Sequence, residues 1–335
     1  LKRGIALTPV KFGISFTLTF LNQAGALVHV YTDGSILLNH GGTEMGQGLF
    51  VKVAQVVAES FQVDIDKVKI TATNTAKVPN TSATAASSGS DMNGMAAADA
   101  CAKIKARLVA FAMERWQVKE KDIEFLPGRV RVGNEEMAFA DLIGEAYRNR
   151  IPLSATGFYA TPKIHWDKEK AEGRPFFYFT YGASVSEVAI DTLTGENRLL
   201  RVDILHDVGK SLNPAIDLGQ IEGGFVQGAG WLTTEELWWD DAGILKTHAP
   251  STYKIPACGD RAPDMRINIW QPGENREDTI HKSKAVGEPP LMLGISAFMA
   301  LSDAIASVSN YTTYPSLDAP ATPECVLAAV KRVSP

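Results

Sequence analysis

Cysteine is scarce in this 335-residue sequence, and the three that occur, Cys101, Cys258 and Cys325, lie far apart. No CxxC pair is present, so the chain's own thiols cannot build a zinc ribbon or an iron–sulfur cluster. An odd number of widely spaced cysteines is typical of proteins from a reducing compartment. In such proteins each thiol acts as a small buried hydrophobic side chain. We therefore expect a cytoplasmic protein.

Long hydrophobic runs are also missing. No segment reaches the ~18 uncharged apolar residues of a membrane span, and the opening LKRGIALTPVKFG lacks the apolar core of a signal peptide. The first residue is Leu1 rather than Met, so we expect a piece of a longer chain. A net charge of −5 and a pI near 5.8 argue against nucleic acid or a membrane surface as partner and favour small molecules or proteins.

Several catalytic signatures are absent. The six histidines never occur in HxH or HExxH spacing, which disfavours a zinc hydrolase. There is no GxSxG elbow for a nucleophilic serine. No GxGxxG motif follows a strand and no Walker lysine motif occurs, so a nucleotide-binding fold is disfavoured as well.

Two stretches share one order of elements. In the first, ALVHVY and SILLNH flank the turn residues 32–34, which predicts an antiparallel hairpin. The segment GGTEMGQGLFVKVAQVVAESF follows, and four apolar residues in it recur at helical spacing: Leu49, Val53, Val57 and Phe61. In the second, ASVSEVAID and NRLLRVDIL flank Thr194 and Gly195, and NPAIDLGQIEGGFVQGAG follows.

Antiparallel hairpins mixed with helices favour an α+β fold. We predict two related subdomains, each of antiparallel strands packed with helices, over residues 1–175 and 176–335. Between the two stretches, a helix is expected after residue 94, with a stripe of Ala97, Cys101, Ile104, Leu108 and Phe111. Residues 117–180 have no clean period and are interpreted as connecting structure and a partner surface.

The stretch KAVGEPPLMLG, residues 284–294, carries one carboxylate, Glu288, before two prolines. Proline favours the first turn of a helix, so Glu288 is expected at the N-cap of a long apolar helix that runs through a core. Free amides and the positive helix end would keep a partly buried carboxylate ionised, as a general base requires. The alternative is a capping acid with no further role.

Three other stretches could bind a ligand. The glycines of GGTEMGQG, residues 41–48, allow close backbone approach, and Gln47 offers a neutral N–H donor; Glu44 may only cap, and the whole stretch may be a tight turn. The small residues of TSATAASSGS, 81–90, fit either a linker or a cradle for a polar ligand. In KFGISFT, 11–17, an expected strand places Phe16 either in the core or against a flat substrate.

Taken in order, KFGISFT, GGTEMGQG, PNTSATAAS, SLNPAIDLGQIEGGFVQG, STYKIPA and KAVGEPPL resemble the molybdenum-binding part of the xanthine dehydrogenase and aldehyde oxidase family. The resemblance spans nearly the whole chain and is closest to the xanthine dehydrogenase branch, as in a separate molybdenum-binding subunit of a bacterial enzyme. It implies hydroxylation of a purine, with an aldehyde or another heteroaromatic ring as the nearest alternative. A non-catalytic scaffold is the alternative of a different class.

The resemblance also implies roles for single residues. Glu288 would be the catalytic base and Gln47 would donate to an oxygen ligand of the metal. Other residues would contact molybdopterin, namely Met45, Gly46, Thr84, Ala85, Ala86, Ser87 and Gln220. Phe16 and Thr17 would hold the substrate ring, and Ala86 would lie beside the metal without ligating it.

The family's upstream glycine-rich loop, second glutamate, substrate-orienting arginine and further phenylalanine have no counterpart in this sequence. The resemblance therefore implies that the chain works with an upstream half of the molybdenum-binding region. It further implies iron–sulfur and FAD centres on partner chains or domains, with electrons passed on to NAD, in a hetero-oligomer.

Overall fold

A computed structural model describes residues 1–334, which form two compact units. Unit 1 comprises residues 1–12, 179–274 and 284 onward, and unit 2 comprises residues 13–178 and 275–283. The sequence had indicated two contiguous ranges instead. The N-terminal strand belongs to unit 1 because it pairs within the sheet of that unit. Residues 275–283 belong to unit 2 because Ile280 packs against the long helix there, beside Gly94.

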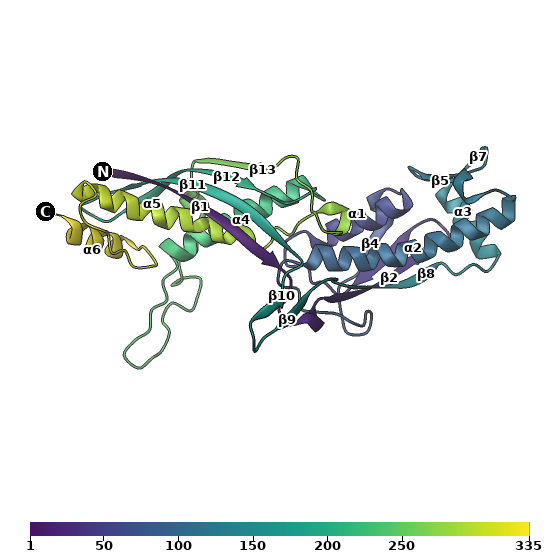
Figure 1. Cartoon of the computed structure of the whole chain (residues 1–335), viewed down its shortest axis with the longest axis horizontal. Helices are drawn as coiled ribbons and strands as arrows, with labels where there is room; N and C mark the ends of the chain where they lie inside the picture. Colours follow the sequence, from purple (N-terminus) through teal and green to yellow (C-terminus); the bar gives the residue numbers. More distant parts are fainter. Residues whose placement is uncertain (335) are drawn as a thin grey trace. The chain divides into compact units, whose positions relative to one another are not determined.

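Unit 2 is built on a four-stranded sheet in the order β4-β3-β2-β8. Figure 1 shows the helices α1 and α2 on one side of this sheet. A smaller sheet, β5-β6-β7, precedes α3, and β9 pairs with β10. The elements are β2 Gln23–Val30, β3 Ile36–His40, α1 Leu49–Phe61, β4 Val68–Ile70, α2 Gly89–Trp116, β5 Ile123–Leu126, β6 Arg129–Val132, β7 Glu135–Ala138, α3 Phe139–Arg148, β8 Ser154–Ala160, β9 His165–Asp167 and β10 Glu172–Arg174.

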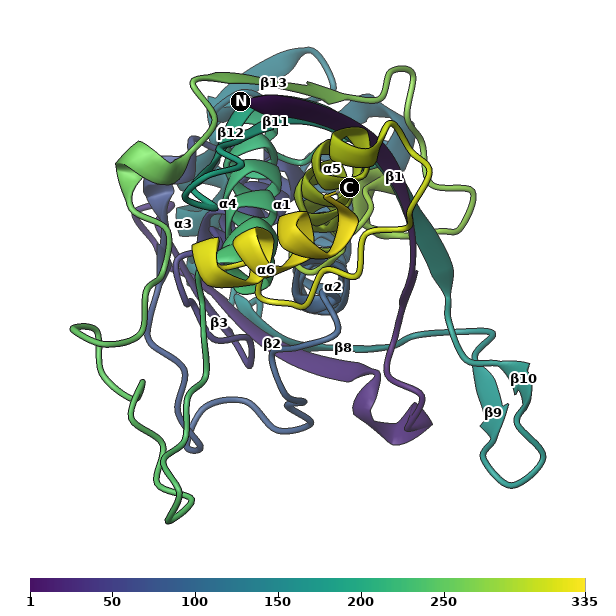
Figure 2. The same cartoon turned by 90° about the vertical axis from the view of Figure 1, so that its left-hand side faces the viewer.

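Unit 1 is built on a second four-stranded sheet in the order β1-β11-β12-β13. Figure 2 shows these strands curving over α4 and α5, with α6 nearest the viewer. The elements are β1 Lys2–Ile14, β11 Tyr178–Ile190, β12 Asn197–His206, α4 Pro214–Thr233, β13 Asp264–Ile269, the 3₁₀ turn η6 Pro289–Gly294, α5 Ile295–Ala306 and α6 Pro323–Val333. β1 continues to Ile14, just past the unit boundary at Phe12, and β11 begins at Tyr178, next to the boundary at Phe179.

The two sheets have the same topology, which confirms the predicted pair of related subdomains and the α+β class. In each unit an antiparallel hairpin is followed by a helix and by a strand parallel to the second hairpin strand. A long loop and a second helix come next, α2 in unit 2 and α5 in unit 1. The fourth strand differs in origin, because β8 follows α2 in the sequence whereas β1 comes from the start of the chain.

The predicted helical stripes form the core of unit 2. Val53, Val57 and Phe61 of α1 are completely buried, as are Ile104 and Leu108 of α2. They pack against alternate residues of the central strands, Ala26, Val28, Ile36 and Leu38. This core fixes the direction in which the loops before α1 and α2 leave the sheet.

Residues 117–180 carry more structure than the sequence indicated. β8 pairs with β2 through residues 154–160 and covers α2. Its backbone lies so close to α2 that a side chain at Gly157 would overlap the carbonyl oxygen of Ala96. Pairing between strands that are more than 100 residues apart leaves no local pattern in the sequence.

The apolar stretch 289–309 is not one helix. Pro289–Gly294 is a 3₁₀ turn and the α-helix begins at Ile295. By length and composition alone Pro289–Ser309 could cross a membrane, contrary to the sequence expectation, but 56% of its most apolar window is buried inside the structure. A core helix meets the same test, and α5 packs on α4 and α6.

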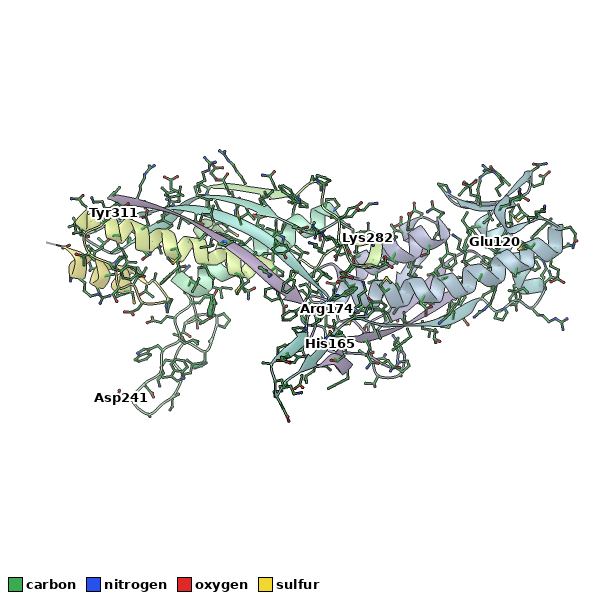
Figure 3. All side chains as sticks on the ribbon, in the orientation of Figure 1. Glu120, His165, Arg174, Asp241, Lys282 and Tyr311 are labelled. Carbon is green, nitrogen blue, oxygen red and sulfur yellow. The ribbon has the colours of Figure 1, made fainter. Side chains whose placement is uncertain are left out.

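An arm of residues 234–257 leaves unit 1 after α4, with Asp241 near its far end (Figure 3). The arm is held by polar contacts, because Asp240 accepts hydrogen bonds from the amides of Ala242 and Ile244 and pairs with Lys246. Its large apolar side chains are about half exposed, namely Leu237, Trp238, Trp239, Ile244 and Ile255.

Candidate functional site

The loop before α1 is organised by the carboxylate of Glu44. Its Oε1 accepts from the amides of Gly46 and Gly48 at 2.9 and 3.0 Å, and its Oε2 from the amide of Phe50 at 2.9 Å. Burial opposes ionisation of Glu44, but these amide hydrogen bonds outweigh it and lower its pKa. Glu44 therefore caps the start of α1, which is the role that the sequence had left open for it.

The side chain of Gln47 closes the same loop. Its Oε1 accepts from the amide of Met45 at 2.6 Å and its Nε2 donates to the carbonyl oxygen of Thr43 at 2.9 Å. A primary amide has two donor hydrogens, so one N–H of Gln47 is left for a further acceptor. Gly46 has φ of +95°, and a Cβ there would meet nothing within 4 Å, so this turn borders open space.

The second loop of unit 2, residues 71–88, lies against the first. The Oγ1 of Thr84 accepts from the amide of Thr43 at 2.9 Å. Ala86 and Ser87, next along this loop, both have left-handed backbone with φ of 55°. Such a conformation costs a non-glycine residue of order 1 kcal/mol, and strained residues of this kind occur at ligand sites as well as in ordinary turns. The structure thus brings the Met45–Gln47 and Thr84–Ser87 stretches together.

Phe16 and Thr17 do not lie in a strand, because β1 ends at Ile14. The buried side chain of Asn22 holds Phe16 instead: its Oδ1 accepts from the Phe16 amide at 2.8 Å and its Nδ2 donates to the Phe16 carbonyl at 2.9 Å. Phe16 is half-buried and Thr17 is exposed. Sequence reasoning missed Asn22, since one asparagine among other polar residues gives no signal.

Glu288 differs from the expectation in two respects. It precedes the 3₁₀ turn rather than an α-helix, and its side chain makes no capping hydrogen bond to that turn. It is also exposed, whereas the two prolines after it are buried. The reason is that Pro289 and Pro290 have no N–H to offer a capping carboxylate. Glu288 thus occupies the N-cap position of η6, but its side chain is exposed and does not cap the turn.

What fixes the position of Glu288 is close packing of its neighbours on α4. A Cβ at Gly224 would lie 2.9 Å from the Cβ of Pro290, and one at Gly228 would overlap the carbonyl oxygen of Leu291. Because these positions of the GQIEGGFVQG motif are glycines, the backbone of η6 can contact the backbone of α4 directly. Gln220 lies four residues before Gly224, on the same face of α4 and one turn nearer its start.

Two buried polar atoms near the loops of unit 2 have no hydrogen-bond partner, Nε2 of His40 and Oγ of Ser82. His40 Nδ1 accepts from the amide of Gly42, so in the neutral ring the proton is on Nε2. Burial lowers the pKa of His40 to about 4, although Glu44 opposes the shift. A neutral polar ligand would supply the missing hydrogen bonds to these two atoms. Buried donors without a partner are rare in folded proteins.

No cluster of three His, Cys, Asp or Glu side chains that could bind a metal occurs within residues 1–334. The spare Gln47 N–H, the left-handed turn at Ala86 and Ser87 and the open space at Gly46 are features that fit a polar organic cofactor.

Comparison with known families gives one match over most of the chain. Residues 1–262 match the family described as molybdopterin cofactor-binding domain. This match includes both loops of unit 2, Phe16 and α4, but not Glu288.

Curated relatives are similar over nearly the whole chain. A xanthine dehydrogenase/oxidase of Mus musculus is 50% identical over 329 residues, which is 96% of this chain and 23% of the relative. A xanthine dehydrogenase of Oryza sativa subsp. japonica is 48% identical, over 98% of this chain and 23% of the relative. The chain thus spans about a quarter of the length of these proteins.

Solved structures agree in fold. Quinoline 2-oxidoreductase from Pseudomonas putida 86 superimposes with a TM-score of 0.83 at 24% identity, covering 98% of this chain and 42% of that one. The aldehyde oxidoreductase from Desulfovibrio gigas gives a TM-score of 0.76 at 24% identity, over 98% of this chain and 32% of that one. At this identity the likeness shows the fold alone.

Proposed function

Because the chain belongs to the molybdopterin cofactor-binding domain family, we propose that it forms part of the molybdenum site of an enzyme that hydroxylates a purine, hypoxanthine or xanthine. The substrate class rests on the curated relatives, whose names are those of xanthine dehydrogenases. When bound, the cofactor would supply the redox chemistry and the metal. The chain's own residues would bind it, orient the substrate and move a proton.

The observation that carries the proposal is the contact of the two loops in unit 2 through Thr43 and Thr84. Through this contact the stretches Met45–Gln47 and Thr84–Ser87 adjoin on the core of unit 2, which supports the proposal of a cofactor cradle there. Gln47 would use its remaining N–H toward an oxygen of the cofactor, and Gln220 would contact the cofactor from α4. Ala86 would leave room for substrate, because its side chain is a single methyl group.

Phe16 and Thr17 would hold the substrate ring by stacking and one hydrogen bond. Glu288 would be the general base, which accepts a proton as the oxygen nucleophile adds to the substrate carbon. Its exposure in this chain means that the cofactor, the substrate or the rest of the protein must exclude water from it. The relatives are about four times as long as this chain, so more protein is expected there.

We further propose that iron–sulfur and FAD centres on other domains or chains take the electrons onward to NAD, in a cytoplasmic hetero-oligomer. Metal analysis of the full-length protein from a molybdenum-competent host tests the cofactor assignment. Molybdenum and pterin near one per site are expected, whereas their absence would favour a non-catalytic scaffold. If the protein turns over aldehydes or quinolines in preference to xanthine, its activity is instead that of an aldehyde oxidase or another heteroaromatic hydroxylase.

The proposed role of Glu288 as general base is tested by the variant Glu288→Gln in the full-length enzyme. The amide keeps the size of the side chain but cannot accept the proton, so kcat should fall by at least ~10²-fold. Molybdenum content should be unchanged, which serves as the control for folding and cofactor loading. Turnover like that of the wild type would show that another residue is the base.

A further inference from the structure

An ion pair in unit 1 lies at the start of the segment that carries Glu288. Lys284 Nζ is 2.5 Å from Asp207 Oδ2, and the two side chains are only 10% and 18% exposed. Most ion pairs on a protein surface contribute little, because water screens them. The pair of Arg266 with Asp264 in the same unit is of that kind, with side chains 54% and 42% exposed.

Lys284 is fixed by its backbone as well as by its side chain. Its amide donates to the carbonyl oxygen of Val208 at 2.8 Å, next to Asp207 in sequence. Its ammonium group also lies 5.4 Å from the ring centroid of Tyr181, within range of a cation–π contact. Residue 284 is thus attached at several points to the ends of β11 and β12.

The residues that lead from Lys284 to Glu288 are held too. Ala285 and Val286 are buried, and the carbonyl oxygen of Ala285 accepts from Oγ1 of Thr180 at 3.2 Å. On the far side of Glu288, Pro290 and Leu291 rest on the glycines of α4. Glu288 therefore lies between two anchored points, of which the ion pair is the first.

The ion pair links two loops that are equivalent to those of the unit 2 site. Asp207 lies between β12 and α4, as Thr43 lies between β3 and α1; Lys284 lies between β13 and α5, as Thr84 lies between β4 and α2. In unit 2 the link is the Thr43–Thr84 hydrogen bond. Both units therefore connect the same two loops, with an ion pair in one and a neutral hydrogen bond in the other.

His206, next to Asp207, does not compete for the carboxylate as a cation. Its ring is buried, and burial lowers its pKa to about 4, with the charge of Lys284 acting in the same direction. The other carboxylate near it, Asp217, accepts from Oγ of Ser211 at 2.5 Å. Lys284 is therefore the basic side chain that pairs with Asp207.

We propose that Lys284 is a positioning residue whose ion pair with Asp207 holds the segment 284–288, and hence the carboxylate of Glu288, in its working place. This inference rests on the proposed role of Glu288 as base. It assigns to Lys284 and Asp207 no contact with substrate or cofactor.

The test uses full-length enzyme with Lys284→Met, Asp207→Asn and the double variant. Displacement of a reacting group by about 1 Å can cost ~10²-fold in rate, so each single variant should lose at least ~10-fold in kcat with KM changed less than ~3-fold. The double variant should be no slower than Lys284→Met, because both changes break one interaction. Lys284→Arg, which keeps the charge, should recover part of the rate, and Arg266→Met should leave it unchanged.

Hydrogen exchange of the backbone amides of residues 284–288 supplies a readout that does not depend on turnover. Faster exchange in Lys284→Met and Asp207→Asn, with normal exchange in Arg266→Met, supports the proposal even if a variant loses molybdenum. Wild-type turnover and exchange, or losses that add in the double variant, would overturn it. Glu288→Gln separates the two hypotheses: if it is inactive while Lys284→Met is fully active, the base stands and the positioning role fails.

Discussion

At the scale of single residues, Asn22 offers the clearest test of the proposed contact between Phe16 and the substrate. Its side chain satisfies both the amide and the carbonyl group of Phe16. In Asn22→Ala these groups lose their partners and Phe16 is free to move, so we expect KM for a purine to rise by ~10-fold or more. Stability should fall by about 1–3 kcal/mol, the usual cost of unpaired buried groups.

Steady-state kinetics and thermal melting of the full-length enzyme measure both effects. Asn149→Ala is a suitable control, since the exposed side chain of Asn149 donates to the carbonyl oxygen of Glu145 at the end of α3, away from the two loops. A KM like that of the wild type in Asn22→Ala would show that Phe16 does not bind the substrate.

Asp91, in the first turn of α2, predicts a pH effect on stability. Burial raises its pKa to about 7, although the hydrogen bond from Tyr178 and the charge of Lys52 act against the shift. Between the ordinary pKa of 3.8 and about 7 the folded state binds a proton that the unfolded state has lost. The contribution of Asp91 is therefore complete below about 4 and is lost as the pH rises toward 7.

Asp91→Asn removes this titration and leaves a neutral side chain of similar shape. The melting temperature of the variant relative to the wild type should therefore rise as the pH is raised from 4 to 7.5. Because both proteins share every other titrating group, the difference isolates Asp91. A difference that is constant over this range would contradict the assignment.

At the scale of elements, the contact between α4 and η6 is the feature most open to test. A methyl group at Gly228 would overlap the Leu291 carbonyl oxygen, so Gly228→Ala must push η6 away. We expect a loss of about 1–3 kcal/mol in stability, as for overpacking in a core, and a lower kcat because Glu288 moves with the turn.

Gly223→Ala is the matched control on the same helix, since a Cβ there would meet nothing within 4 Å. It should be neutral or stabilise by about 0.5–1 kcal/mol, because alanine favours helix more than glycine does. Equal behaviour of the two variants in melting and kinetics would show that the backbone contact is not what places Glu288.

The elements with local signals were predictable from sequence. The two hairpins follow from their turn residues, and α1 and α2 from apolar stripes whose members are buried as expected. The start of α5 was wrong, because proline at the first turn does not distinguish a 3₁₀ turn from an α-helix. β8 and the sheet position of β1 were missed, since only distant parts of the chain determine them.

At the scale of the whole molecule, the sequence indicated two candidate loops but not the contacts that hold them together. The motifs located the Met45–Gln47 and Thr84–Ser87 stretches, which the fold of unit 2 does bring together. The links that hold such loops, Thr43 with Thr84 and Asp207 with Lys284, join residues 41 and 77 positions apart. The spacing of residues along the sequence does not indicate such long-range pairs.

The repeated topology explains why the candidate residues are spread over the chain. Except for Phe16 and Thr17, which lie between β1 and β2, they lie in the loops before the first and second helix of each unit or on those helices. This arrangement is what duplication of one supersecondary unit would produce. Each copy then supplies different side chains from matching positions.

The main-chain contact of η6 with α4 limits how Glu288 can move. Side chains that pack against each other can exchange rotamers, but carbonyl and Cα atoms in contact have no such freedom. The Glu288 carboxylate can then change its position relative to α4 mainly by rotation about the side-chain torsions of Glu288. A change in the distance between α4 and the carboxylate oxygens would therefore require new torsions in the Glu288 side chain, because η6 itself cannot approach α4 any further.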